Sequence, residues 1–247
     1  MELDRERVAT EVLRTELTQQ LHHLICPDIP YERLVYLRKK AREVPEILNS
    51  PEIHYAERPE ELERSLKNTL AMQEFANREN LTHSEAIAMM AQYNEVTNWQ
   101  YHFGFFLEIF AVQASEEQKA RYMPQINSLE IVACFAQTEL GHGSNVRGIE
   151  TTAHYNVESD HFILNSPSIT SIKWWVGALG VGSNFALLVA RLIIQENDYG
   201  PHALFVQIRD RKTHEPLPGV SVGDIGPKMG LVGNDNGFLK FESFKVL

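Results

Sequence analysis

The chain of 247 residues contains little of what marks a secreted or membrane protein. It has two cysteines, Cys26 in a histidine-rich helical context and Cys134 in an apolar run. Two are too few for a disulfide scaffold, and we expect two buried free thiols. Residues 1–7 are mostly charged where a signal peptide needs an apolar stretch, and no later run approaches membrane-spanning length. The sequence therefore predicts a soluble intracellular protein without a membrane span.

Basic residues and the familiar catalytic motifs are also scarce. The 33 acidic side chains outnumber the 23 basic ones, and the formal net charge of −10 would repel a nucleic-acid backbone. There is no His-Glu-x-x-His, no phosphate loop ending in Gly-Lys-Ser/Thr and no Gly-x-Ser-x-Gly. Gly141 and Gly143 lack the third glycine of a dinucleotide-binding turn, and His22, His23 and Cys26 complete no known metal-ligand set. We therefore expect no nucleic-acid partner, no Rossmann site and no metal.

What the first half does contain is helical periodicity. From residue 1 to about 127, apolar residues return at intervals of three and four. Leu62, Leu66 and Leu70 form one apolar stripe on a helix that is entered through Pro59. The pattern predicts an N-terminal helical domain.

Two segments of this half also match the capping box, in which two side chains three residues apart cap the first N–H groups of a helix. The pairs are Thr82 with Glu85 and Ser115 with Gln118. The first box predicts a helix that presents Ile87, Met90 and Ala91. The second predicts another short helix, which must end soon after Pro124.

After about Leu129 the pattern changes to short apolar runs rich in β-branched residues and separated by glycines. We predict strands over residues 131–137, 151–157, 161–164, 186–194, 203–208 and 237–241. The polar residues Glu158, Ser159 and Asp160 should close a hairpin. Helices followed by strands favour an α+β fold, with an N-terminal helical domain over residues 1–129 and a small antiparallel β domain, a barrel or a sandwich, over residues 130–247.

The segment from Cys134 to Val146 is the one most able to carry chemistry. An apolar strand runs into Gln137, Thr138 and Glu139 and then into a tight turn with two glycines. Glycines let the backbone approach a ligand and expose N–H donors, and the Thr138 hydroxyl can donate or accept, which suits a flat cofactor with polar edges such as a flavin. By composition alone, an ordinary exit from a strand into a turn is equally compatible.

The residue order in this segment resembles the Thr-Glu-x-Gly-x-Gly-Ser/Thr stretch of the peroxisomal acyl-CoA oxidases. A second block, Asn165-Ser166-Pro167 through Lys173-Trp174-Trp175-Val176-Gly177, is similar to the stretch that walls the flavin ring in that family. Further likeness, strong from about residue 99 onward, is found in the segments 102–105, 200–203, 214–220, 223–230 and 235–239. The resemblance covers the family's N-terminal and β domains and implies that its C-terminal helical domains are missing here.

The resemblance implies a flavoenzyme that binds FAD. Its matched flavin contacts are Thr138 and Gly177, with Gln137, Gly143, Ser144 and Trp175 as neighbours. In the family reaction, FAD takes a hydride from a fatty acyl-CoA, which becomes a trans-2-enoyl-CoA, and dioxygen reoxidises the flavin to give hydrogen peroxide. The family's catalytic base is a glutamate in the C-terminal helical region, so no catalytic residue is assigned in this chain.

The resemblance leaves several expectations and alternatives. It implies peroxisomal fatty acid β-oxidation and a homodimer, although the chain ends in Lys-Val-Leu without a peroxisomal address. Two cationic clusters, 38–42 and 209–212, could meet CoA phosphates or could be solvated faces. Instead of a catalytic piece of an oxidase, the chain could be a non-catalytic partner of a complete one. A weaker alternative is an acyl-CoA dehydrogenase.

Overall fold

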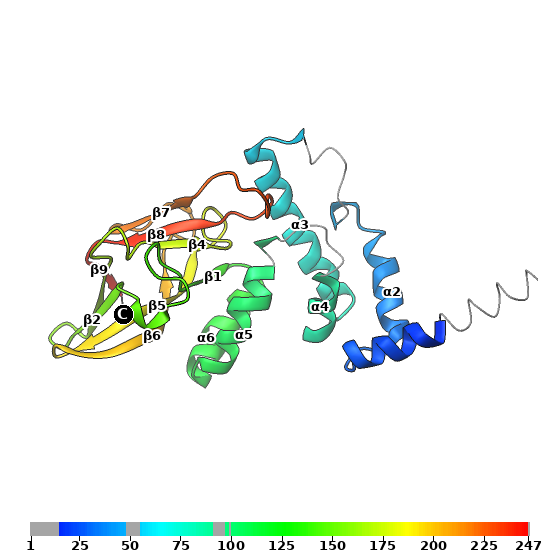
Figure 1. The fold of residues 1–247 in the computed structure, drawn as a ribbon, viewed down its shortest axis with the longest axis horizontal. Helices are drawn as coiled ribbons and strands as arrows, with labels where there is room; N and C mark the ends of the chain where they lie inside the picture. Colours follow the sequence, from blue (N-terminus) through cyan, green and yellow to red (C-terminus); the bar gives the residue numbers. More distant parts are fainter. Residues whose placement is uncertain (1–14, 48–54, 91–96, 99, 247) are drawn as a thin grey trace, which may run out of the picture. The chain divides into compact units, whose positions relative to one another are not determined.

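The computed structural model of the chain describes residues 15–47, 55–90, 97–98 and 100–246 (Figure 1). The chain divides into two compact units, one of residues 1–51 and 70–94 and the other of residues 52–69 and 95–247. We call them the helical unit and the β unit and describe each by itself. Within the described ranges, no helix combines the length and the apolar character needed to cross a membrane. The domain boundary predicted at residues 129 and 130 stays a prediction.

The helical segments come first along the chain. They are residues 15–25, α2 (Tyr31–Ala41), η1 (Pro45–Ile47), α3 (Arg58–Arg78), α4 (His83–Met90), the π-helix η3 (Gln100–Phe106), α5 (Leu107–Gln113), α6 (Glu116–Asn127) and, between strands, η4 (Val146–Gly148). The first part of α3, up to residue 69, belongs to the β unit, and the part from residue 70 onward belongs to the helical unit.

Both capping boxes are confirmed. The Glu85 N–H donates to Thr82 Oγ1 over 3.3 Å, and the Thr82 N–H donates to Glu85 Oε2 over 2.8 Å. Ser115 and Gln118 make the same reciprocal pair at the start of α6, which ends three residues after Pro124 as expected. These helix starts are set by side chains only three residues apart, which is why the sequence alone locates them.

The apolar faces of two helices are placed less well by the sequence. The leucine stripe lies on α3, but Leu66 is 37% and Leu70 56% exposed, whereas Met72 and Phe75 are buried. On α4, Ile87 is exposed and Met89 is buried, while the Met90 side chain and Ala91 lie outside the described residues. The face that packs is therefore the one with the bulkier aromatic and thioether side chains, which bury more apolar area.

The strands form two sheets in the β unit. Their bounds are β1 (Ala133–Ala136), β2 (Thr152–Asn156), β3 (His161–Asn165), β4 (Lys173–Val176), β5 (Phe185–Ile194), β6 (Asn197–Gln207), β7 (Val220–Asp224), β8 (Gly237–Phe241) and β9 (Phe244–Val246). One sheet has the order β1-β5-β2-β3-β9 with β6 paired to β5, and the other has the order β4-β8-β7. Figure 1 shows the two sheets as separate layers.

The predicted α+β class, with helices before strands, is confirmed, and so is the hairpin between β2 and β3. All six predicted strands are present, β8 at the predicted residues 237–241 and the other five with shifted ends, but β4, β7 and β9 were not predicted. The expectation of an antiparallel domain is corrected in one respect, because β1 and β2 both pair with β5 in parallel. β1 and β2 lie along the same edge of the long strand β5, and the periodicity of a single strand cannot predict which strands become its neighbours.

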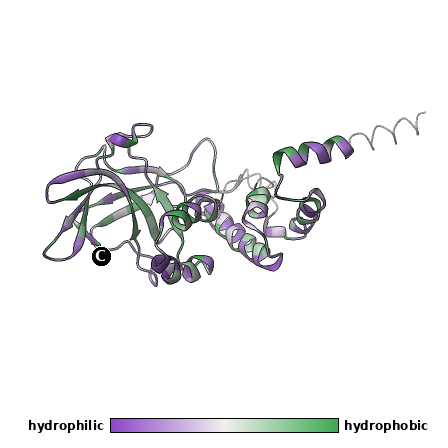
Figure 2. Ribbon diagram, turned by 90° about the horizontal axis from the view of Figure 1, so that it is seen from below, coloured by the Kyte–Doolittle hydropathy of each residue, from purple (hydrophilic) through white to green (hydrophobic). Residues whose placement is uncertain are grey.

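The core of the β unit lies between the sheets and beneath the helices. One cluster contains residues of β1, β5, β6 and β8, such as Leu188, Val206 and Phe241, all fully buried. A second cluster packs Phe106 and Phe110 against the other face of β5 and β6. In Figure 2 the strands in the middle of this unit are hydrophobic, whereas the hairpin ends are hydrophilic.

Candidate functional site

The two motif segments lie side by side in the β unit. The Trp174 N–H donates to the Thr138 carbonyl over 2.9 Å, and the Leu140 N–H donates to the Ile172 carbonyl over 2.9 Å. Glu139 and Lys173 form an isolated antiparallel bridge between them. The strand exit at residues 137–144 is thus held along β4, which carries the tryptophan pair.

Glu139 is a fully buried anchor of this arrangement. Its carboxylate accepts hydrogen bonds from the Thr151 hydroxyl at 2.6 Å, from the N–H groups of Glu150 and Thr151 at 2.8 and 2.9 Å, and from the Lys173 ammonium at 3.0 Å. His142 Nδ1 lies 3.0 Å from the same carboxylate. Burial alone would raise the pKa of Glu139, but Lys173 and these donors hold that pKa below its usual value. A carboxylate whose oxygens are engaged by this many donors has a structural role.

Lys173 completes the anchor from β4. Its ammonium also donates to the carbonyls of Gln137 at 3.0 Å and Val189 at 2.6 Å, and the side chain has no exposed surface. Burial lowers the pKa of Lys173 to about 8, so the lysine remains charged at neutral pH. The buried pair therefore joins β1, β4 and β5 behind the motif segments.

The glycine turn has one closed side and one open side. A methyl group on Gly141 would lie 2.8 Å from the Thr170 Cβ, so this glycine allows the turn to touch its neighbour. A methyl group on Gly143 would meet nothing within 4 Å, and Ser144 is exposed. Across the described part of the chain, the N–H groups of Gly143 and Ser144 and the Thr138 hydroxyl have no hydrogen-bond partner. The turn therefore presents unpaired polar groups beside open space.

Trp175 stands in a strained backbone conformation. Its φ is 72°, in the left-handed region that bulky residues rarely adopt, and it lies where the pairing of β4 with β8 shifts register. The side chain is 50% exposed, whereas Trp174 stacks with Phe238 at 6.3 Å between ring centroids. Trp174 is partly buried, and Trp175 is the more exposed of the two.

Gly177 follows in a turn over residues 175–183, in which residues 176–180 are buried. A side chain on Gly177 would overlap the ring of Tyr101 from η3, so only glycine fits between this turn and the π-helix. The turn is held from the loop before β8, where the Asn236 side chain donates to the Trp175 carbonyl over 2.8 Å. Neither Tyr101 nor Asn236 was singled out from the sequence, because each acts through a partner more than 50 residues away.

The six predicted flavin residues thus fall on two neighbouring segments. Four of them, Gln137, Thr138, Gly143 and Ser144, lie on the strand exit and turn, and Trp175 and Gly177 lie on β4 and the turn after it. Their role toward a flavin stays a prediction.

Other candidates have plainer roles. Cys26 and Cys134 are free, as predicted, although only Cys134 is buried, and burial raises its thiol pKa to about 12. His22 Nε2 contacts the Ile29 carbonyl at 2.6 Å. Arg209 was offered as a phosphate contact, which is wrong because its guanidinium is buried and donates to carbonyls of the turn at residues 179–183.

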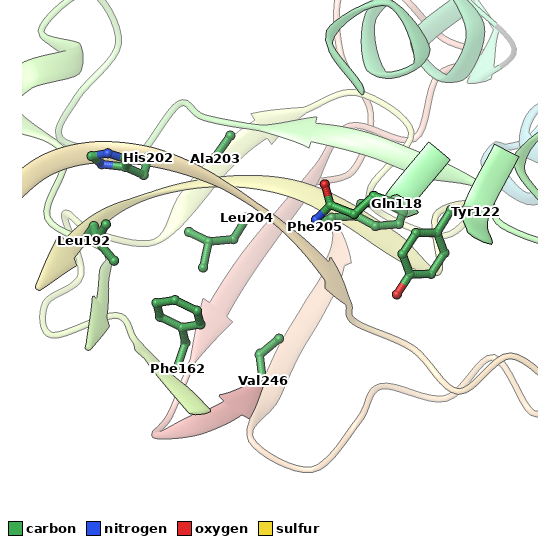
Figure 3. Close-up of a pocket in the computed structure, with 9 residues that line it drawn as sticks. All are labelled: Gln118, Tyr122, Phe162, Leu192, His202, Ala203, Leu204, Phe205 and Val246. Carbon is green, nitrogen blue, oxygen red and sulfur yellow. The ribbon is translucent and has the colours of Figure 1, made fainter. Parts of the chain in front are cut away.

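A cavity of about 300 Å³ lies elsewhere in the β unit (Figure 3). It is lined by Gln118, Tyr122, Phe162, Leu192, His202, Ala203, Leu204, Phe205 and Val246. None of the six candidate flavin residues contributes to it, so it is separate from the paired motif segments.

Comparison with known families assigns both parts of the chain. Residues 30–132 match the family model described as acyl-coenzyme A oxidase N-terminal, and residues 134–244 match the acyl-CoA dehydrogenase middle domain. Among curated proteins, acyl-coenzyme A oxidase acox-1.2 of Caenorhabditis elegans is 52% identical over 145 residues, which are 59% of this chain and 22% of the relative. Human peroxisomal acyl-coenzyme A oxidase 1 is 47% identical over 145 residues, with the same coverage.

Solved structures agree. Acyl-CoA oxidase-2 of Caenorhabditis elegans, bound with FAD, ascaroside-CoA and ATP, superposes with a TM-score of 0.84 at 36% identity, covering 93% of this chain and 35% of that protein. Arabidopsis thaliana acyl-CoA oxidase 1 superposes with a TM-score of 0.81 at 34% identity, covering 88% and 34%. The chain therefore spans about a third of the length of these oxidases.

Proposed function

Because the chain belongs to the acyl-CoA oxidase family, of which it carries the N-terminal and middle domains, we propose that it is the flavin-side part of an FAD-dependent acyl-CoA oxidase. The proposed reaction converts a fatty acyl-CoA into a trans-2-enoyl-CoA and reduces dioxygen to hydrogen peroxide. The observation that carries this proposal is the pairing of two motif segments around unpaired donors and an outward tryptophan.

The residues present fit a flavin. The open space at Gly143 and the unpaired N–H groups of Gly143 and Ser144 suit a flat ligand with polar edges. Thr138 and Gly177 would contact the flavin, with Gln137 beside them. When bound, FAD supplies the hydride acceptor and the route to dioxygen, and the protein supplies binding and orientation.

On this proposal the chain's own residues hold and shape the site. Trp175 forms an apolar wall whose position is set by the register shift in β4. The Glu139–Lys173 pair keeps the strand exit against β4 without taking part in proton transfer. The base that removes the α proton would come from the part of the relatives that this chain does not match, because Glu139 is fully engaged and Glu150 is held by Thr170 and Ser168.

The names of the relatives support a proposal for the cellular setting. Several are named peroxisomal acyl-coenzyme A oxidase 1, from cattle, orangutan, rat and human. We propose that the chain acts in the peroxisome, in fatty acid β-oxidation, and that it functions within a homodimer of the family type.

The test compares the chain alone with the chain supplemented by the remaining two thirds of a Caenorhabditis elegans relative. We expect the 247-residue chain alone to bind FAD poorly and to make no peroxide from palmitoyl-CoA. The supplemented chain should show a flavin absorbance spectrum and peroxide production. Tight flavin binding and turnover by the chain alone would contradict the proposed division of roles, and no flavin in either sample would contradict the proposed function.

A further inference from the structure

The loop before β8 contains three consecutive polar residues that are almost completely buried. Asn234 and Asp235 have no exposed surface, and Asn236 is 1% exposed. Burying a polar group costs free energy unless the group is hydrogen-bonded. The hydrogen-bond partners of these three residues therefore indicate the structural role of the loop.

All three residues hold the turn over residues 175–183. The Asn236 side chain donates to the Trp175 carbonyl, and Asn234 Oδ1 accepts the Ala178 N–H over 3.1 Å. The Asp235 carbonyl accepts the Gly180 N–H over 2.8 Å. Each of the three loop residues therefore hydrogen-bonds a different residue of the turn.

Asp235 makes the closest contacts of the set. Its Oδ2 accepts the N–H groups of Val181 and Gly182, both at 2.6 Å. One carboxylate oxygen can accept two hydrogen bonds, and such bonds from N–H groups to a charged oxygen are stronger than neutral ones. Asp235 Oδ1 has no hydrogen-bond partner among the described residues, and the Asn98 side chain also hydrogen-bonds this carboxylate. Burial raises the pKa of Asp235, whereas the bonds from Val181, Gly182 and Asn98 lower it.

The turn needs this support because it is strained. Trp175 and Ala178 both have positive φ, of 72° and 62°, a region that non-glycine residues adopt only at a cost in free energy. Strained conformations persist only where the surroundings over-determine them. Arg209 assists from the other side, donating to the carbonyls of Leu179 and Gly180 at 3.1 and 2.8 Å.

Close packing makes the turn's position depend on the loop. A methyl group on Gly237, two residues after Asp235, would lie 2.6 Å from the Gly180 nitrogen. The backbone of the turn therefore rests directly on the start of β8, and a shift of the loop moves the turn.

We propose that Asp235 is a positioning residue of the flavin site: by accepting the N–H groups of Val181 and Gly182, it holds the strained turn that presents Trp175 and Gly177 to the flavin. This inference rests on the proposed function. It adds a residue that contacts no flavin itself and acts through the backbone of the turn.

The test uses Asp235→Asn and Asp235→Ala in the chain supplemented with the remaining two thirds of the Caenorhabditis elegans relative, with FAD as the probe. Asparagine keeps an acceptor oxygen of the same shape, whereas alanine removes it. We expect FAD affinity to fall about threefold to tenfold in D235N and about tenfold to a hundredfold in D235A. The resolved shoulders of the flavin absorbance band should blur in the same order. Asp198→Asn, which removes an exposed carboxylate 2.7 Å from Arg191, is the matched control and should leave both readouts unchanged.

A second measurement separates this inference from the proposed function. Amide hydrogen exchange at Val181 and Gly182 in the 247-residue chain needs no flavin, and it should be faster in both variants, more so in D235A. If the supplemented wild-type chain binds no FAD, the proposed function is wrong, and the positioning role toward a flavin is wrong with it. This holds even if hydrogen exchange shows that Asp235 holds the turn. If the wild type binds FAD and D235N binds it equally well, the positioning role is wrong and the function stands. Should D235A fail to fold, the D235N result decides.

Discussion

His102 should make the β unit sensitive to mild acid. It is completely buried in η3, where its Nδ1 accepts the Ala133 N–H over 3.1 Å and its Nε2 lies 3.2 Å from the Ile126 carbonyl. A ring that accepts at one nitrogen and donates at the other is the neutral tautomer, and it joins η3, α6 and β1. Burial lowers the pKa of His102 to about 4 from the ordinary value of 6.5.

The sign of the effect follows from which state binds the proton. Between pH 6.5 and about 4 the unfolded chain protonates this histidine and the folded chain does not. The stabilisation is therefore complete above pH 6.5, falls as the pH falls and is lost below about pH 4. The full shift corresponds to about 3 kcal/mol, most of which is lost by about pH 4.5.

The perturbation that isolates this effect is His102→Gln. A glutamine amide can donate to the Ile126 carbonyl and accept the Ala133 N–H, but it does not titrate. At about pH 7 we expect H102Q to be about 1–2 kcal/mol less stable than the wild type, because the ring contacts with Phe103 and Phe106 at 4.5 and 5.5 Å are lost. At about pH 4.5 that difference should vanish or reverse.

The assay is urea unfolding followed by tryptophan fluorescence, since Trp174 and Trp175 belong to the β unit. Carboxylates titrate in the same pH range in every variant and lower the stability of all of them. The effect of His102 is therefore the difference between variants in the free energy of unfolding lost on acidification. His154→Gln, at an exposed position of β2, is the control and should show the wild-type pH dependence. If H102Q loses as much stability as the wild type between the two pH values, a neutral, buried His102 is not the cause and the reasoning fails.

Three other substitutions probe the paired motif segments. Gly143→Ala should leave the urea midpoint within about 0.5 kcal/mol of the wild type, because its methyl group enters open space, while FAD binding by the supplemented chain weakens; unchanged binding would remove Gly143 from the site. Gly177→Ala should lower stability measurably because of overlap with Tyr101, and a wild-type midpoint would show that the ring moves aside freely. Glu139→Gln should cost about 3 kcal/mol or more in urea unfolding, since it leaves Lys173 buried without its anion; a cost under about 1 kcal/mol would mean that the lysine finds another partner or loses its proton.

The parts of the candidate site that could be predicted from the sequence are those formed by residues adjacent in the chain. The strand exit and the tryptophan pair were each located as segments, and the structure places them side by side. β4 itself was not predicted as a strand, because it has only four residues and no alternation of exposed and buried positions. The Glu139–Lys173 pair was also not foreseen, since its members are 34 residues apart.

By itself, the sequence determined the elements whose causes are local. Capping boxes, the polar turn between β2 and β3 and the glycines of the strand exit all act through neighbours a few residues away, so their effects can be worked out without a fold. Only the tertiary structure decided which face of α3 is buried, that β5 takes two parallel partners and that Asp235 holds a turn more than 50 residues earlier. Those outcomes depend on packing and on hydrogen bonds between distant segments, whose energies are realised only once the chain has folded.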